Sequence, residues 1–137
     1  MSLLDKFRLD GKVAVITGAG KGIGAGIARA FAEAGADVVI GARTAADLER
    51  VAHDIRAMGR RALVVPTDVL DFMQLQHLAD RALQEFARID ILVNNAGGFP
   101  PKPVAKTTAR EFEGAFRFNV STAFELSRIC APLMVES

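Results

Sequence analysis

The stretch Thr17-Gly18-Ala19-Gly20-Lys21-Gly22-Ile23-Gly24 lies between an apolar run at residues 13–16 and an amphipathic segment that begins at Ile23. This order is typical of a strand that leads through a glycine-rich turn into a helix. Such a turn carries few side chains, so backbone N–H groups and the positive end of the helix can approach an anionic ligand. We therefore interpret the stretch as a phosphate-binding turn, with a tight turn that binds nothing as the alternative.

The glycine spacing is G-x-x-x-G-x-G from Gly18 to Gly24. It differs from the G-x-G-x-x-G of the usual dinucleotide fingerprint and from G-x-x-x-x-G-K-[ST], so a P-loop is excluded. Gly20, Gly22 and Ala25 fit only a loose G-x-G-x-x-A. Because glycine-rich turns are common, the spacing alone does not identify a ligand.

Apolar runs alternate along the chain with segments of helical periodicity. The expected strands are residues 12–17, 37–41, 62–65 and 89–93. The expected helices are residues 23–34, with Ile23, Ile27, Phe31 and Ala34 as the apolar stripe, then 48–58, 75–86 and a long helix from about Thr108. Regular alternation implies right-handed crossovers and a parallel sheet covered on both faces. The sequence predicts one doubly wound, Rossmann-type α/β domain over residues 1–137, with strand order 3-2-1-4.

The long helix carries its own start and stop signals. Thr108 and Glu111 fit a capping box, and Pro132 can kink or end the helix. Its apolar side chains, among them Phe112, Phe116 and Phe124, form one stripe. A stripe of this kind needs cover from another part of the protein or from a second copy.

Composition narrows the function classes. The chain has 137 residues and a net charge of +1, without runs of like charge, so nothing indicates general affinity for nucleic acid or for membranes. No apolar run approaches the roughly 20 residues of a membrane span. The single cysteine, Cys130, is expected to be a buried, inert thiol. Since no export signal opens the chain, we expect a cytoplasmic protein.

In a doubly wound sheet the ligand binds at the carboxyl ends of the strands. An acidic side chain at the end of the second strand normally takes the ribose hydroxyls of a dinucleotide, but here that position reads Ala42-Arg43. Arg43 suits the 2′-phosphate of NADP, with Lys21 as a second positive charge. We therefore predict NADP, with NAD as the alternative cofactor; both bases could also be ordinary solvated side chains. Asp37, the only nearby acid, precedes the strand and lies at the wrong end.

Asp68 follows the third strand and suits a hydrogen bond to the adenine amino group, although a helix N-cap is an equal alternative. His53 and His77 fall on expected helices away from the strand ends, where solvated or structural roles are expected. With one cysteine and two histidines so placed, we expect no metal site.

Four motifs in order carry a family resemblance: Thr17-Gly18-x-x-x-Gly22-Ile23-Gly24, Asp68-Val69, Asn94-Asn95-Ala96-Gly97, and Asn119-Val120. Together they resemble the classical short-chain dehydrogenase/reductase family, over essentially the whole chain. Within that family, residues 89–132 are similar to bacterial hydroxysteroid dehydrogenases and to 3-oxoacyl carrier-protein reductases.

The resemblance implies a role for each motif. Gly18, Lys21, Gly22, Ile23 and the adjoining Gly24 would line the pyrophosphate, Asp68 and Val69 the adenine, and Asn95, Ala96 and Gly97 the ribose side. Asn119 matches the catalytic asparagine, which helps to hold a water in the proton relay; the alternative is a polar residue satisfied within a helix bundle. Arg43 would select NADP. Family members that use NAD carry an acid where this chain has Ala42.

The family transfers a hydride between nicotinamide and a carbonyl or secondary alcohol, with a proton from a Tyr-x-x-x-Lys pair assisted by serine. This chain has no tyrosine. We therefore expect residues 1–137 to be the cofactor half of a longer oxidoreductase, incomplete at its C-terminal end and inactive alone. The alternative is a complete, non-catalytic nucleotide-binding or oligomerisation module. An apolar strand at residues 89–93 would then form a bare sheet edge, which argues against it.

By the same resemblance, the helix over residues 108–134 would form an interface in a homo-oligomer, either a dimer or a tetramer. The expected partner of the site is a small carbonyl or alcohol substrate, steroid-like or 3-oxoacyl. No nucleic acid or membrane partner is expected.

Overall fold

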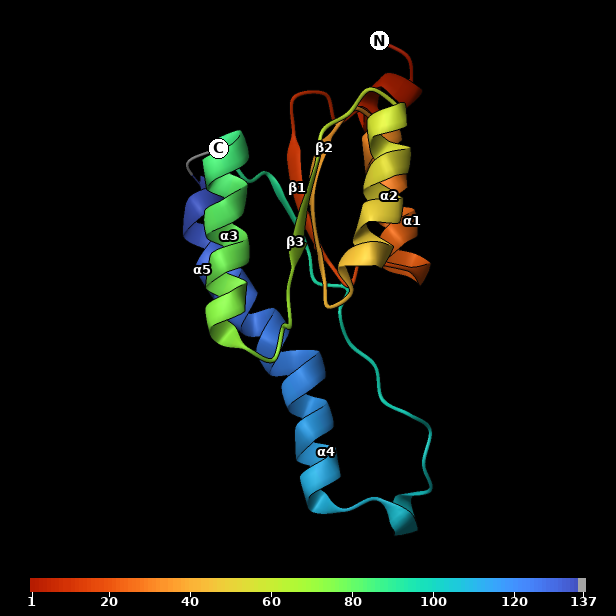
Figure 1. The fold of residues 1–137 in the computed structure, drawn as a ribbon, viewed down its shortest axis with the longest axis vertical. Coiled ribbons are helices and arrows are strands. Elements are labelled where there is room, and N and C mark those ends of the chain that lie inside the picture. The colour runs from red at the N-terminus through yellow and green to blue at the C-terminus, as the bar shows by residue number, and fades with distance from the viewer. Residues whose placement is uncertain (136–137) are drawn as a thin grey trace.

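The computed structural model describes residues 1–135. A parallel 4-stranded sheet in the order β3-β2-β1-β4 is covered by helices on both faces (Figure 1). The strands are β1 (Val13–Thr17), β2 (Asp37–Ala42), β3 (Ala62–Pro66) and β4 (Ile91–Val93). The helices are α1 (Gly22–Glu33), α2 (Ala45–Ala57), α3 (Phe72–Phe86), α4 (Ala109–Phe116) and α5 (Thr122–Val135), with short 3-10 turns at Leu4–Phe7 and Val104–Lys106. The predicted fold class and strand order are confirmed.

Each strand contributes side chains to two separate cores, because successive side chains point to opposite faces of the sheet. Val13 and Val15 pack in the core beneath α3 and α5, whereas Ala14 and Ile16 pack in the core beneath α1 and α2. Figure 1 shows these two helix pairs on opposite sides of the sheet. Burial on both faces explains why the strands read as continuous apolar runs rather than as alternating patterns.

The apolar stripe predicted for α1 is partly wrong. Ile23 is 77% exposed, and the fully buried face consists of Ala25, Ala28 and Ala32. Ile27 and Phe31 of the predicted stripe are partly buried against the same core. Small side chains on the fully buried face let the helix approach the sheet closely. At Gly24 the helix lies directly against the glycine-rich turn, where an added Cβ would lie 2.2 Å from the Gly18 carbonyl oxygen.

The edge strand β4 begins at Ile91 rather than at the expected residue 89. Its pairing with β1 starts at Ala14 opposite Ile91. Just before it, the Asp90 carboxylate accepts the Val13 N–H at 2.9 Å and pairs with Arg88 at 2.7 Å. The hydrogen bond from Arg88 holds the pKa of Asp90 below its usual value. The three residues of β4 are only half-buried.

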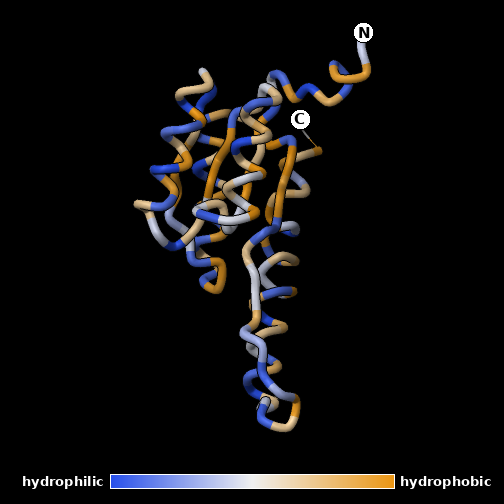
Figure 2. Tube along the Cα trace, turned by 90° about the vertical axis from the view of Figure 1, so that its right-hand side faces the viewer, coloured by the Kyte–Doolittle hydropathy of each residue, from blue (hydrophilic) through white to orange (hydrophobic). Residues whose placement is uncertain are grey.

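The helix expected from Thr108 is divided into α4 and α5 by a π-helical turn, η3 (Arg117–Ser121). Thr108 caps α4 by accepting the Glu111 N–H at 3.1 Å. The Glu111 carboxylate pairs with Lys102 at 2.6 Å. The hydrogen bond from Lys102 holds the pKa of Glu111 below its usual value, and the Thr108 backbone adds to this effect, as the second half of a capping box would. Pro132 lies inside α5, which continues to Val135. None of the residues of α4 is buried, and α4 projects from the body of the molecule as a narrow extension (Figure 2).

Cys130 lies on α5 in the core, and burial raises the pKa of its thiol to about 11. The predicted buried thiol is confirmed. Within residues 1–135, no helix combines the length and apolar character that crossing a membrane requires.

Two loops that are far apart in the sequence are joined by the hydroxyl of Thr17, the last residue of β1. The backbone N–H groups of Asn95 and Ala96 both donate to Thr17 Oγ1 at 3.1 Å. The Asn95 side-chain amide donates to the Gly18 carbonyl at 3.1 Å. These bonds hold the glycine-rich turn against the loop that follows β4. We call the set the Thr17–Asn95 clasp.

We expect Gly24→Ala to destabilise the fold by about 3 kcal/mol or more, because the new methyl group would overlap the Gly18 carbonyl. Gly26→Ala is the matched control on the same helix, since no atom lies within 4 Å of the added Cβ. It should stabilise the protein by up to roughly 1 kcal/mol through helix propensity. Urea unfolding of both variants provides the measurement. Similar unfolding free energies for the two would contradict the close packing at Gly24.

Thr17→Val removes the shared acceptor of the clasp while keeping the side-chain shape. Two N–H donors then lose their partner, which should lower the unfolding free energy by about 1–3 kcal/mol. Thr44→Val is the control, because Thr44 is exposed and makes no capping hydrogen bond. Chemical unfolding measures both changes. If Thr17→Val were as mild as Thr44→Val, the clasp would not contribute to stability.

Candidate functional site

A cavity of about 440 Å³ lies at the carboxyl ends of the strands. Pockets for small ligands and cofactors usually measure about 300–1,000 Å³. Five segments form its walls: the glycine-rich turn, the stretch from the end of β2 to the start of α2, the β3–α3 loop, the loop after β4, and Phe118 of the π turn. The lining residues are Gly18, Gly20, Lys21, Ala42, Arg43, Thr44, Asp47, Thr67, Asp68, Val69, Leu70, Asn95, Ala96, Gly97 and Phe118.

The first turn of α1 opens beside this cavity without a side-chain cap. Its N-cap residue, Lys21, is extended and makes no capping hydrogen bond, and the turn contains no acidic residue. In contrast, α3 is capped by Asp71, which accepts the Met73 N–H at 3.0 Å. Helix N-terminal N–H groups without protein partners are natural anion donors. The start of α1 therefore fits a phosphate group.

Gly22 leaves the approach to these N–H groups open. Its φ angle is +59°, which favours glycine, and no atom lies within 4 Å of an added Cβ. Gly18, by comparison, lies against Asn95, whose amide nitrogen would be 2.8 Å from an added Cβ. Gly22 therefore keeps the approach to the N–H groups open, whereas Gly18 allows the turn to pack closely against Asn95.

Two cations line the cavity. Lys21 and Arg43 are both exposed, and neither forms an ion pair with any residue of the described range 1–135. Arg43 directly follows Ala42, the last residue of β2, which also lines the cavity. The arrangement leaves positive charge available at the end of β2.

Asp68 and Val69 form the wall that follows β3. The Asp68 carboxylate accepts the Leu70 N–H at 3.0 Å, and the Asp68 N–H donates to Gln74 at 2.8 Å. The N-cap alternative for Asp68 is wrong, because Asp71 caps α3. Asp68 instead holds the loop in shape with one carboxylate oxygen while it lines the cavity.

The opposite wall is formed by Asn95, Ala96 and Gly97, which the Thr17–Asn95 clasp holds against the glycine-rich turn. Asn119 lies behind this wall rather than in the cavity. Its Oδ1 accepts the Gly98 N–H at 2.8 Å, and its Nδ2 donates to the carbonyls of Gly98 and Ala115, both at 2.9 Å. Both ends of the Asn119 amide therefore fasten the loop after β4 to the long helix.

The π turn accounts for this use of Asn119. In a regular α-helix the Ala115 carbonyl would accept the backbone N–H of Asn119. Here the Ala115 carbonyl accepts the side-chain amide of Asn119, which lies within the π turn. Isolated π turns often mark functional sites.

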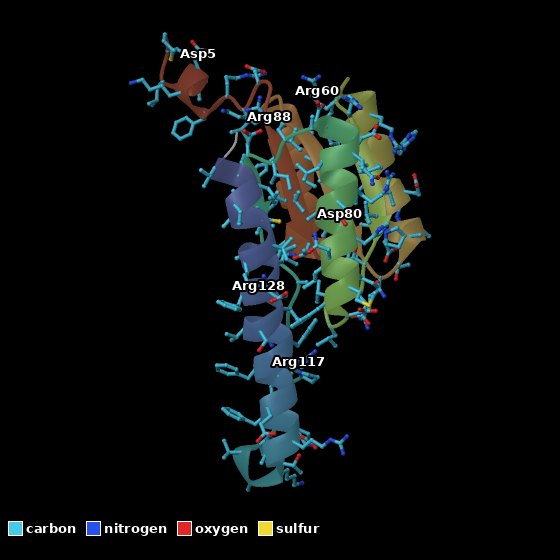
Figure 3. All side chains as sticks on the ribbon, turned by 90° about the vertical axis from the view of Figure 1, so that its left-hand side faces the viewer. Asp5, Arg60, Asp80, Arg88, Arg117 and Arg128 are labelled. Carbon is cyan, nitrogen blue, oxygen red and sulfur yellow. The ribbon has the colours of Figure 1, made fainter. Side chains whose placement is uncertain are left out.

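Arg117 ties the same turn to the other side of the cavity. Its guanidinium lies over the Phe72 ring, 4.8 Å from the ring centre, and donates to the Leu70 carbonyl at 3.5 Å. Figure 3 shows Arg117 on the long helix, below Arg128 in that view. The π turn thus contacts both the β3–α3 loop and the loop after β4.

The structure brings most of the predicted site residues together. Gly22, Ile23, Gly24 and Asn119 do not line the cavity; Gly24 is packed beneath Gly18, and Ile23 is exposed. The lining residues that the sequence analysis did not assign as binding residues are Gly20, Ala42, Thr44, Asp47, Thr67, Leu70 and Phe118.

Asp47 is the most consequential of the missed residues, because Asp37 is not the only acid near the site. It lies four residues after Arg43, which is one turn along α2, and that spacing was the available signal. His53 and His77 are exposed on α2 and α3 and do not line the cavity. Residues 1–135 contain no cluster of acidic, histidine or cysteine side chains suited to a metal ion.

Comparison with known proteins gives a consistent result. The family model described as short chain dehydrogenase matches residues 12–137. An uncharacterized oxidoreductase of Mycobacterium tuberculosis (strain CDC 1551 / Oshkosh) is 50% identical over 134 residues, covering 98% of this chain and 51% of that protein. The 7alpha-hydroxysteroid dehydrogenase of Escherichia coli (strain K12) is 45% identical over 130 residues, covering 95% of this chain and 51% of that protein.

Solved structures agree with these sequence matches. A 7 alpha-hydroxysteroid dehydrogenase complexed with NADH and 7-oxo glycochenodeoxycholic acid superposes with a TM-score of 0.94 at 43% identity, covering 99% of this chain and 53% of that one. The chain thus spans about half the length of the curated relatives it matches. Since the family match extends over nearly all of its residues, the chain belongs to the short-chain dehydrogenase family.

Proposed function

We propose that residues 1–137 form a domain that binds NADP and serves as the cofactor half of an oxidoreductase. The observation that carries the proposal is the cavity that Lys21 and Arg43 line, beside which the uncapped start of α1 opens. A nicotinamide dinucleotide phosphate carries a pyrophosphate and a 2′-phosphate, so it needs an anion-binding turn and further positive charge nearby. Family membership supports a dinucleotide as the ligand.

The roles follow from position in the cavity. The glycine-rich turn, from Gly18 to the first residues of α1, would hold the pyrophosphate, and Arg43 with Lys21 would hold the 2′-phosphate. Asp68 and Val69 would border the adenine, and the Asn95–Gly97 segment the ribose on the nicotinamide side. NAD is the second candidate, because a similar solved enzyme is complexed with NADH.

When bound, the nicotinamide supplies or takes up a hydride at a carbonyl or secondary alcohol. This chain's contribution is to bind and orient: the clasp sets the distance between the turn and the loop after β4, and Asn119 fixes that loop to the long helix. By its resemblance to the family's catalytic asparagine, Asn119 would also help to position a water of the proton relay. With no tyrosine in the 137 residues, we expect cofactor binding without turnover from this chain alone.

The substrate class remains a steroid-like or 3-oxoacyl carbonyl or alcohol. Similar proteins include 7alpha-hydroxysteroid dehydrogenase and, at 38% identity over 126 residues, versicolorin reductase 1 of Dothistroma septosporum. The first name indicates a steroid alcohol as substrate, and the second indicates a reduction. Membership in a family of oxidoreductases supports this function over a non-catalytic nucleotide-binding or oligomerisation module.

We further propose that a second copy of this chain covers the long helix. Phe112, Phe116, Val120 and Phe124 are 65%, 57%, 45% and 67% exposed. They recur every four residues across α4, the π turn and α5, which places them along one side of the helix. An exposed apolar stripe of this length is typical of an interface rather than of a monomer surface.

Arg43→Ala should weaken NADPH binding by about tenfold or more and NADH binding by less than about twofold, because a charge-assisted hydrogen bond contributes roughly 1.5–3 kcal/mol. Titration of the fluorescence of each reduced cofactor provides the measurement. Arg110→Ala is the control, since Arg110 is exposed on α4 and outside the cavity. Equal losses for the two cofactors would remove Arg43 from the 2′-phosphate site.

Phe116→Glu should shift the protein toward monomer in sedimentation velocity, because a charge would be buried in the apolar interface. Met73→Glu is the control: Met73 is 83% exposed on α3, away from the stripe. A wild-type chain that sediments as a monomer, or an oligomer unchanged by Phe116→Glu, would contradict the proposed interface.

A further inference from the structure

The cavity contains a carboxylate whose charge opposes a phosphate ligand. Asp47, in the first turn of α2, lines the cavity together with Arg43. An added Cβ on Gly20 would lie 3.1 Å from Asp47 Cβ and 3.9 Å from Asp47 Oδ2. The Asp47 side chain therefore packs against the glycine-rich turn at Gly20, with Oδ2 on the same side, and it is 28% exposed.

The other carboxylate oxygen, Oδ1, is held by Arg50, one turn further along α2. Arg50 does not line the cavity, and its side chain is 69% exposed. Exposed ion pairs of this kind contribute little to stability. The pair is therefore better placed to tune the charge of the cavity than to stabilise α2.

The charges that line the cavity are nearly balanced. Lys21 and Arg43 are positive, whereas Asp47 and Asp68 are negative. A phosphate monoester brings a charge of about −1.5 to −2 at neutral pH. A single unpaired carboxylate within several ångströms would repel such a phosphate. Whether the Asp47 carboxylate is paired or free therefore affects the binding of a ligand with a 2′-phosphate, and affects much less the binding of a ligand without it.

We propose that Asp47 sets how strongly this site discriminates between NADP and NAD, and that Arg50 acts through Asp47 as a positioning residue. The inference rests on the proposed NADP-binding function. While Arg50 pairs with Asp47, the carboxylate is partly neutralised and Arg43 with Lys21 accept the 2′-phosphate. Without Arg50, the free carboxylate repels that phosphate.

Adenosine 2′,5′-bisphosphate and adenosine 5′-monophosphate are suitable probes, because they differ only in the 2′-phosphate and require no turnover. Isothermal titration calorimetry gives the affinity of the chain for each. Asp47→Asn should tighten bisphosphate binding about three- to tenfold, and Arg50→Gln should weaken it by a similar factor, with monophosphate binding changed by less than about twofold. Both changes should shrink as salt is raised.

The double variant Asp47→Asn/Arg50→Gln separates the two residues. If Arg50 acts through Asp47, the double variant should match Asp47→Asn alone. If Arg50 contacted the phosphate directly, the loss caused by Arg50→Gln would persist in the Asp47→Asn background, and its proposed role would be wrong. Asp54→Asn is the matched control, since Asp54 lies on α2 and pairs with Arg29 at 2.9 Å outside the cavity.

The remaining outcomes are also decisive. Tighter bisphosphate binding in Asp47→Asn but not in Asp54→Asn supports the inference. A loss of monophosphate affinity in Asp47→Asn would assign the carboxylate to the ribose hydroxyls and overturn it. An unchanged affinity ratio overturns it while leaving NADP binding intact, whereas a wild-type chain that binds neither probe contradicts the proposed function itself.

Discussion

The hydroxyl of Thr17 is the contact on which the shape of the cavity depends. It accepts the N–H groups of Asn95 and Ala96, and the Asn95 side chain in turn reaches the Gly18 carbonyl. Because these residues follow two neighbouring parallel strands, the sheet brings them to the same edge, and the hydroxyl then fixes their separation. The glycine-rich turn and the loop after β4 thereby become two walls of a single cavity rather than two independent loops.

Some polar groups in and beside the cavity walls lack a protein partner, and a bound anion would supply one. The start of α1 lacks a side-chain cap, although α3 and α4 have one. Lys21 and Arg43 both line the cavity, and neither forms an ion pair within residues 1–135, whereas Asp47 pairs with Arg50. Departures from local consistency of this kind are expected at functional sites. They cost little in the free protein because the groups remain accessible to water.

Much of the fold follows from local pattern. Continuous apolar runs such as Val13–Ile16 and Val38–Ile40 can be buried only between two helix layers, and glycine at Gly35 and Gly59 ends the helices before the next strands. Alternation with helical segments then leaves few topologies, and the order β3-β2-β1-β4 is among them. The residues at the strand ends, including Arg43, Asp68 and Asn95, were accessible to the same reasoning.

The sequence by itself therefore determined the layers, the strand order and most of the cavity wall, because these depend on short-range periodicity and on the carboxyl ends of parallel strands. Only the tertiary structure decided which helix face is buried, so Ile23 is exposed while Ala25 packs inward. It alone placed Asp47 against Gly20, divided the long helix at Asn119, and gave the N-cap of α3 to Asp71 instead of Asp68. Each of these depends on the exact distance between packed elements, which no local pattern encodes.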